Sequence, residues 1–288
     1  MTTTQARPVI RSQSMMGSVV SAHVHDDASS EFIDAVISSV FEELSIYESM
    51  FSTFQKTSEI SRINLGDLHI LDASREVIDV LDACFYLEGI SKGAFSAHRL
   101  DGSLDPAGFV KGWAVERASR QFDIAGLRNW YVSLGGDMQL GDPPLDEMTQ
   151  LHEWKVGIAD PHHDGAVVMG LSVERGAVAT SGIAERSSHL VDPRTGQSCH
   201  YWSSVTVTGP SLTWADAFAT VACVMGEHGL NWVHHFEGYS ALGVRPDGML
   251  VTVARSDEVP HVSVEQYSLF DAPGFVASLW PTAQYRVR

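Results

Sequence analysis

Thr213-Trp-Ala-Asp-Ala-Phe-Ala-Thr-Val-Ala-Cys223 is a run of small and apolar residues that predicts a helix over Leu212–Met225, ended by Gly226. Within it, Asp216 and Thr220 stand four residues apart, so their Cβ atoms lie about 5 to 6 Å apart on one helix face. A carboxylate and a hydroxyl at that spacing can ligate one hard cation. Mg²⁺ needs few protein ligands, because water and substrate phosphates complete its octahedron. The alternative is a chance polar pair on a solvated helix.

The remaining pattern predicts an α+β domain in which helices and antiparallel strands are segregated. Apolar periodicity, Ser caps and Gly stops predict helices that begin at Ser29 or Ser30, near Ser58, and over Ser74–Gly89, Lys111–Ala125 and Leu230–Phe236. Short β-branched or aromatic runs predict strands over Met16–His25, Trp130–Leu134, Trp154–Ile158, Val167–Val173, Ala177–Thr180 and Val205–Thr208, and a hairpin of Ala241–Arg245 with Leu250–Ala254.

Length and charge bound the organisation and the partners. With 288 residues and no Pro-, Gly- or Ser-rich linker, the chain is expected to form one compact domain over 16–288 after a flexible N-terminus over 1–15. The 36 acidic residues outnumber the 19 basic ones, which gives a formal charge of −17. That charge argues against a nucleic-acid partner, which needs clustered Lys and Arg. An anionic ligand must be met locally, by helix N-termini, a few cations or a divalent metal.

The cysteines and the apolar runs of the sequence indicate the cellular compartment. Cys84, Cys199 and Cys223 are an odd set without C-x-x-C spacing, so free buried thiols are expected rather than a disulfide framework or a zinc cluster. No apolar run approaches the roughly 20 residues that span a bilayer, and the N-terminus lacks a signal-peptide core or a cysteine for a lipid. We therefore expect a cytoplasmic protein without membrane insertion.

Several Gly-bearing polar segments accompany the Asp216 helix in a fixed order. They are Asp105-Pro-Ala-Gly-Phe-Val-Lys-Gly-Trp-Ala114, Val132-Ser-Leu-Gly-Gly-Asp-Met138, Ala177-Val-Ala-Thr-Ser-Gly182 and Ser188-His-Leu-Val-Asp-Pro-Arg-Thr-Gly196. Two earlier blocks, Met16-Gly-Ser18 and Phe51-Ser-Thr-Phe54 with Ser58-Glu-Ile-Ser-Arg-Ile-Asn64, belong to the same pattern. Together these motifs resemble the ApbE family of FAD:protein FMN transferases over about Met16–Gly226.

The resemblance implies a single ApbE-like, T-fold-related α+β domain that uses Mg²⁺ and takes FAD as substrate. Members cleave the FAD pyrophosphate, release AMP and leave FMN esterified to a Thr or Ser of an acceptor flavoprotein. For the metal it implies side-chain oxygens from Asp216 and Thr220 and the backbone carbonyl of Gly108, where a small residue allows close approach. Asp105 and Lys111 are implied to contact FAD.

The remaining flavin-binding positions follow from the same motifs. They are Met16, Phe54, Ala94, Phe95, Ser96, Thr180, Ser181 and Val191. For catalysis, His189 or the nearby carboxylate of Asp192 is expected to take the acceptor proton, while Lys111 and Mg²⁺ offset charge on the phosphoryl group. The alternative for Asp192-Pro-Arg194 is a rigid turn in which the Arg ties down the carboxylate. Asp105 and Lys111 also have purely structural alternatives: Asp105 could form a turn with Pro106, and Lys111 could be an exposed cation at the start of a helix.

The chain departs from the family pattern in three places. Gly93-Ala-Phe-Ser96 ends only nine residues before Asp105, where members carry a much longer segment, and Ser96 replaces a usual aspartate. Phe54 replaces a common Tyr, and Ala219 stands where some members have a second metal-side aspartate. A reduced cover over the flavin keeps two other functions open, an FAD pyrophosphatase and a non-catalytic FAD-binding or delivery protein.

Overall fold

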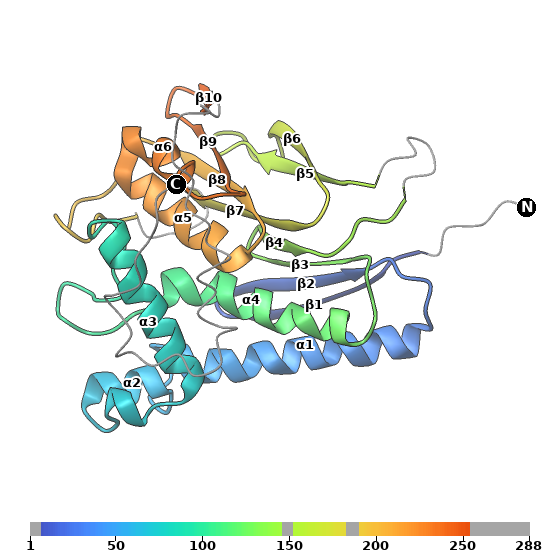
Figure 1. Ribbon diagram of the computed structural model, residues 1–288, viewed down its shortest axis with the longest axis horizontal. Coiled ribbons are helices and arrows are strands. Elements are labelled where there is room, and N and C mark those ends of the chain that lie inside the picture. The colour runs from blue at the N-terminus through green and yellow to red at the C-terminus, as the bar shows by residue number, and fades with distance from the viewer. Residues whose placement is uncertain (1–6, 146–151, 183–189, 254–288) are drawn as a thin grey trace, which may run out of the picture.

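A computed structural model of the chain describes residues 7–145, 152–182 and 190–253. Its centre is an antiparallel sheet of eight strands, with helices α1, α4 and α5 on one face (Figure 1). The strands, in their order across the sheet, are β1 (Val9–Met15), β2 (Ser18–Val24), β3 (Trp130–Leu134), β4 (Asp137–Leu140), β7 (Gly176–Gly182), β8 (Ser204–Gly209), β9 (Ser240–Val244) and β10 (Leu250–Thr252). The predicted α+β class is confirmed.

The helices of the described chain differ in how they begin, and three of them follow a serine cap. They are α1 (Ser30–Phe51), α2 (Glu59–Leu65), α3 (Arg75–Ile90), α4 (Ala107–Ile124), α5 (Leu212–Met225) and α6 (Gly229–Val233), with short 3₁₀ turns at η1 (Ile70–Asp72) and η2 (Gly226–His228). Ser29, Ser58 and Ser74 each accept a backbone N–H of the first turn, which confirms the predicted starts. None of the helices in the described ranges is long and apolar enough to cross a membrane.

Two strands and one helix start differ from expectation. The flexible start expected over 1–15 is wrong for Val9–Met15, which pairs with β2 from Val9 opposite Val24 to Met15 opposite Ser18. The strand β4 is not among the predicted strands, because Asp137 follows Gly135 and Gly136, a pair typical of a turn. Helix α4 begins at Ala107 rather than Lys111, since Pro106 can precede a helix without losing a needed N–H.

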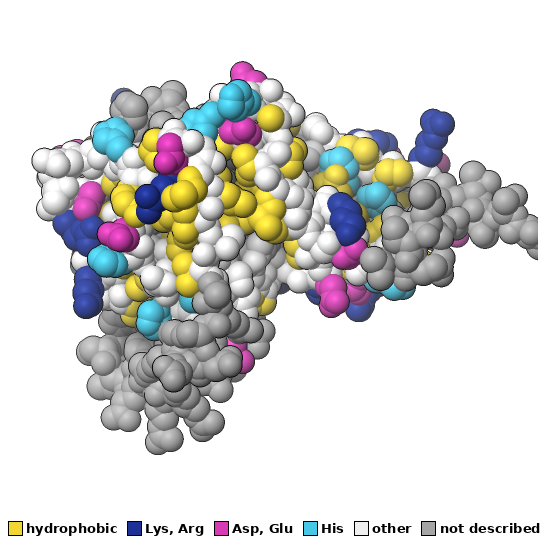
Figure 2. Space-filling model, turned by 90° about the horizontal axis from the view of Figure 1, so that it is seen from above, with side chains coloured by type: hydrophobic (Ala, Val, Ile, Leu, Met, Phe, Trp, Pro, Cys, Tyr) yellow, Lys and Arg dark blue, Asp and Glu magenta, His cyan; other side chains and the backbone are white. Residues whose placement is uncertain are grey.

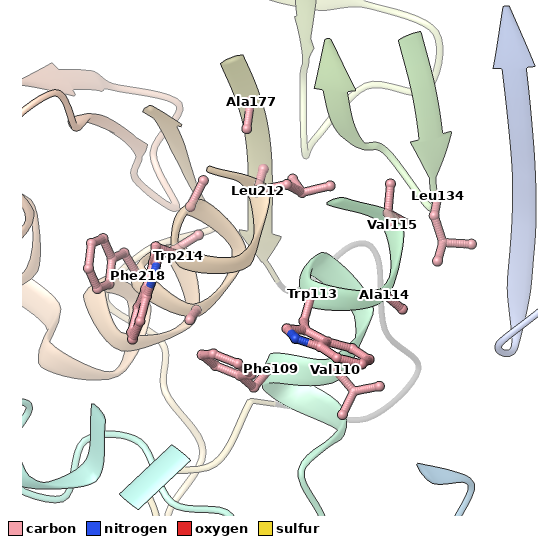
Figure 3. Packing of buried hydrophobic residues seen from close by; sticks show 14 of the residues in the cluster. Phe109, Val110, Trp113, Ala114, Val115, Leu134, Ala177, Leu212, Trp214 and Phe218 are labelled. Atoms are coloured by element: carbon pink, nitrogen blue, oxygen red, sulfur yellow. The ribbon is translucent and has the colours of Figure 1, made fainter. Parts of the chain in front are cut away.

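Two apolar clusters lie on opposite faces of the sheet. On the helix face, α5 is buried between α4 and strands β7 and β8, and Phe109 meets Trp214 edge to face with centroids 5.5 Å apart (Figure 3). On the other face, a hairpin of β5 (Trp154–Ala159) and β6 (Val167–Val173) packs on the sheet through Trp154, Val156, Ile158, Leu140, Val178 and Leu242. On the face seen in Figure 2, Lys and Arg lie singly beside acidic and His side chains, without a continuous basic surface among the described residues.

Helices α4 and α5 touch through their backbones at Gly112. A Cβ atom there would lie 2.6 Å from the carbonyl oxygen of Leu212 and 2.9 Å from the Cβ of Asp216. One turn further along α4, the Glu116 carboxylate accepts from the Ser211 hydroxyl at 2.6 Å and from the Thr213 backbone N–H at 2.8 Å. A side chain of α4 therefore caps α5, whose own N-cap residue forms no side-chain capping bond.

We expect Gly112→Ala to destabilise the protein by about 1–3 kcal/mol, because the added methyl group must push α5 away from α4. Chemical denaturation measures the loss. Gly89→Ala is the matched control: Gly89 lies in α3, and a Cβ added there would meet no atom within 4 Å, so alanine is expected to be neutral or stabilising by up to about 1 kcal/mol. Equal effects of the two substitutions would contradict a close backbone contact at Gly112.

Candidate active site

A cavity of about 340 Å³ lies where the β1–β2 turn, the end of α1 and the start of α4 meet. Its walls include four predicted flavin contacts, Met16, Phe54, Asp105 and Lys111. Phe54 is 93% exposed at the mouth, so its ring is available to a ligand. A larger, more open hollow of about 580 Å³ between the end of β6 and the β8–α5 loop includes none of the predicted site residues among those described.

The Met16–Gly17 turn forms one wall of this cavity in an unfavourable conformation. Met16 has φ +52° and Gly17 φ +72°, so both occupy the left-handed region. Only Gly enters that region freely, and a residue with a side chain pays about 1–2 kcal/mol there. The Met16 N–H donates to Glu48 Oε1 at 2.9 Å, and Glu48 lines the same cavity from α1. No sequence motif points to Glu48.

Asp105 is held by its neighbours in a half-buried position. Arg99 Nη2 and Nε donate to its Oδ2 at 2.6 and 2.9 Å, and its Oδ1 accepts from the Ala107 N–H at 3.2 Å. Arg99 belongs to the short loop between His98 and Leu104, which no motif of the sequence marks. This loop therefore places a second cation, besides Lys111, next to the cavity.

Lys111 and Asp137 form an ion pair between α4 and the start of β4. Asp137 is 1% exposed, and its Oδ1 also accepts from the Thr180 N–H at 2.9 Å. Burial raises the pKa of Asp137 to about 7, the negative charge of Asp216 contributes to the rise, and Lys111 opposes both effects. The Lys111 ammonium is thus paired with Asp137, and Asp216 lies close enough to Asp137 for the two carboxyl groups to interact.

Asp216 and Thr220 are both buried, which excludes the solvated-pair alternative. Asp216 Oδ2 accepts from the Gly112 N–H at 3.1 Å, whereas its buried Oδ1 has no hydrogen-bond partner among the described residues. In an α-helix that N–H faces the carbonyl four residues earlier, so the Gly108 carbonyl lies near Asp216. Thr220 Oγ1 is 3.0 Å from Ser181 Oγ. A buried, unsatisfied carboxylate oxygen near a carbonyl and a hydroxyl fits a hard divalent cation.

The ligand set is sparse. Within 7–145, 152–182 and 190–253, no group of three or more His, Cys, Asp or Glu side chains could hold a metal ion. A cation beside Asp216 would therefore take its other ligands from hydroxyls, carbonyls, water or a substrate. That composition suits Mg²⁺, which keeps water and phosphate ligands.

Other predicted flavin contacts lie around this centre rather than in the cavity wall. Ala94 and Phe95 are buried, and the Phe95 ring is 3.3 Å from where a Cβ of residue 108 would stand, so it packs behind Gly108. Ser96 Oγ donates to Glu88 at 3.2 Å and accepts from the His98 N–H at 3.0 Å. Direct contact of Ala94 and Phe95 with a ligand is not favoured by this placement, which makes them supports of the Gly108 backbone.

Strand β7 contacts both Asp137 and Thr220. The Thr180 N–H donates to Asp137, and the Thr180 hydroxyl lies 2.8 Å from Thr206 Oγ1, while Ser181 meets Thr220. Cys223 donates its Sγ hydrogen to the Ser181 carbonyl at 3.2 Å, and burial raises the pKa of this thiol to about 12. Cys223 is therefore an inert packing residue in this site.

The Asp192 side chain is tied down within its own turn, so its role as a base stays a prediction. Its two carboxylate oxygens pair with Arg194 Nε at 2.9 Å and Nη2 at 2.8 Å, which confirms the rigid-turn alternative. These hydrogen bonds lower the pKa of Asp192, so it holds a proton poorly. Val191 lies in a separate hollow with His98, Leu100 and Pro193. The other candidate base, His189, lies outside the described residues.

Comparisons with known proteins place the chain in a protein family. The sequence pattern of the family described as ApbE family matches residues 16–99 and 96–242. The FAD:protein FMN transferase of Treponema pallidum is 33% identical over 160 residues, covering 50% of this chain and 44% of the relative. The FAD:protein FMN transferase of Rhodobacter capsulatus is 36% identical over 134 residues, which cover 43% of this chain and 24% of the relative. The alignments thus span less than half the length of these relatives.

Solved structures share the fold. The ApbE protein from Thermotoga maritima has a TM-score of 0.74 at 20% identity, with 93% of this chain and 100% of that chain covered. The flavin transferase ApbE from Vibrio cholerae has a TM-score of 0.69 at 23% identity, with 87% and 97% covered. The match extends over nearly the whole of both structures, so the sheet and helices described above form the common fold.

The raised pKa of Asp137 predicts a pH effect on stability. The folded state holds this proton up to about pH 7 and the unfolded state only up to about pH 4, so stability falls as the pH rises through that range. We expect Asp137→Asn to remove this fall. The measurement is the urea midpoint of both proteins at pH 5 and at pH 8, without divalent ions, and the difference between the two proteins should change between these pH values.

Asp192→Asn serves as the control for Asp137→Asn. The pKa of Asp192 is lowered, so the stability it contributes is present above about pH 4 and disappears on acidification. Between pH 5 and pH 8 the Asp192→Asn difference is therefore expected to stay constant. Parallel profiles of the unsubstituted protein and Asp137→Asn over this range would contradict the proton assigned to Asp137.

Proposed function

The chain belongs to the ApbE family, and on this premise we propose that it is a Mg²⁺-dependent transferase. In this proposal it moves FMN from FAD to a Thr or Ser hydroxyl of an acceptor flavoprotein and releases AMP. The names of the relatives support flavin transfer. The single observation that carries the metal-dependent part is the buried Asp216 Oδ1, which has no hydrogen-bond partner in the described chain and lies near the pair Lys111–Asp137.

Substrate binding follows from the cavity walls. A flat flavin ring would stack between the exposed Phe54 ring and the thioether of Met16. Lys111 and Arg99 lie beside the cavity, each paired with an aspartate, and would share their N–H donors with the diphosphate. Local cations thus attract an anionic ligand that the overall charge would repel.

The transfer step needs positioning more than a strong nucleophile. The acceptor oxygen forms a bond to the FMN phosphorus, the bond from that phosphorus to the AMP oxygen breaks, and the acceptor proton passes to a base. A bound Mg²⁺ would offset charge on the pyrophosphate oxygens, held by Asp216, Thr220 and the Gly108 carbonyl. Asp137 orients the Lys111 ammonium, and His189 stays the proposed base.

One observation favours hydrolysis as a second candidate. Phe54 is almost fully exposed, and the loop from His98 to Leu104 that precedes Asp105 is short, so water can reach a bound diphosphate. The same site would then release FMN and AMP without an acceptor. A delivery protein without turnover is less well supported, because binding FAD alone gives no use to the unsatisfied oxygen of Asp216.

The test is to incubate the chain with FAD, Mg²⁺ and an acceptor protein that carries an Asp-x-x-Thr segment. AMP, free FMN and acceptor mass are then measured. Acceptor that gains FMN supports transfer, free FMN supports hydrolysis, and FAD binding without AMP contradicts both. We expect Asp216→Asn to lower AMP release by at least about 100-fold, because one charged ligand for the phosphate-bound cation is lost.

Asp164→Asn provides the matched control for Asp216→Asn. It makes the same change of charge at an exposed residue between β5 and β6, and we expect AMP release within about 2-fold of the unsubstituted protein. Thr220→Val is expected to raise the Mg²⁺ concentration needed for half-maximal activity, because it removes a neutral oxygen. Unchanged Mg²⁺ dependence in both Asp216→Asn and Thr220→Val would contradict the metal site.

A further inference from the structure

We propose that Glu48 is a positioning residue that holds the strained Met16–Gly17 turn as a clamp for the flavin ring. The inference rests on the proposed function, because it takes the cavity beside Lys111 as the flavin site. It goes beyond that function by assigning a role to a residue outside every motif of the sequence. The clamp has three parts: the turn, the carboxylate that holds it, and the cavity into which it faces.

The backbone conformation of this turn is energetically unfavourable for a methionine. Register pairing of Met15 with Ser18 leaves Met16 and Gly17 as a two-residue hairpin loop with positive φ at both positions. Such loops favour Asn-Gly or Gly-Gly, because Asn and Gly enter the left-handed region easily. A methionine at the first position is unfavourable for the turn. Its presence points to a role for the side chain besides closing the hairpin, and part of that side chain packs against the core.

Glu48 supplies the interaction that offsets this cost. Its Oε1 accepts the Met16 N–H at 2.9 Å across 32 residues of sequence, from the last turn of α1. A hydrogen bond to a charged acceptor is stronger than one to a neutral group. Because α1 is packed against the sheet, the carboxylate fixes the turn relative to the rest of the cavity.

The cavity gives the held methionine its use. Met16, Gly17 and Glu48 line the same wall, and Phe54 and Lys111 belong to the same cavity. A thioether makes favourable contacts with an aromatic ring and adapts to its edge. Fixing Met16 before the ligand arrives lowers the entropy lost on binding, which raises affinity.

Lys92 provides a control that separates the effect of backbone strain from the proposed effect on the ligand. Lys92, like Met16, has positive φ and precedes a glycine, but it follows α3 and does not line the cavity. Substitution by asparagine should relieve the same kind of strain at both positions. Only at position 16 should it affect the ligand.

The experiment is a double-mutant cycle on the full chain with FAD and Mg²⁺. We expect Lys92→Asn to raise the melting temperature, and Met16→Asn to raise it less, because Met16→Asn also loses apolar contact with the core. Met16→Asn should weaken FAD binding at least about 10-fold, and Lys92→Asn by less than about 2-fold. Glu48→Ala should weaken binding about 10-fold alone, but by less than about 3-fold when combined with Met16→Asn, because no strained clamp is left to hold. Glu48→Gln, which keeps an acceptor oxygen, should retain most of the affinity.

Two outcomes would overturn the proposal. If Glu48→Ala weakens FAD binding by the same factor with and without Met16→Asn, Glu48 acts on the ligand itself and not through the turn. If Met16→Asn leaves the FAD dissociation constant unchanged, the turn is no clamp. Both readouts are binding constants, so they are separate from the transferase test: FAD binding without AMP release would contradict the proposed function and leave the clamp standing.

Discussion

The backbone contact between α4 and α5 at Gly112 is the constraint on which the site depends. Only because residue 112 lacks a Cβ can the Leu212 carbonyl and the Asp216 side chain approach the helix so closely. That approach lets a carboxylate of one helix accept a backbone N–H of the other at 3.1 Å. It also places Asp216 near the Gly108 carbonyl and close enough to Asp137 for the two negative charges to interact. Glu116 then caps α5 from α4 and fixes the pair.

Electrostatics turn this close packing into a binding site. Burying two carboxylates is costly unless cations or hydrogen bonds compensate them. Here Lys111, the Thr180 N–H and the Gly112 N–H compensate most but not all of the charge, since one oxygen of Asp216 lacks a hydrogen bond in the described part of the chain. A fold selected only for stability would replace such a centre with apolar residues. Its presence in a buried position is the pattern expected of a functional site.

The sequence allowed correct prediction wherever a local signal was strong. Helix α5 has the predicted bounds because small apolar residues end at a glycine, and β3 and β6 also have the predicted bounds. Edge strand β1 was missed because Ile-Arg-Ser-Gln-Ser has no apolar alternation on an exposed edge. Helical spacing singled out Asp216 and Thr220, which both lie buried on α5, and their role as metal ligands stays a proposal. The hydrogen bond from Met16 to Glu48 joins residues 32 positions apart, which no local pattern could reveal.

The departure before Asp105 has a physical meaning in the folded chain. The resemblance leads one to expect a long segment between Ser96 and Asp105, yet here a bridge between His98 and Leu104 closes a short loop. That loop carries Arg99, whose guanidinium neutralises one side of Asp105. Without it, Asp105, Asp137 and Asp216 would set three carboxylates against Lys111 near the cavity proposed to hold a diphosphate. The short loop therefore contributes a guanidinium that neutralises Asp105 beside the proposed ligand cavity of an acidic chain.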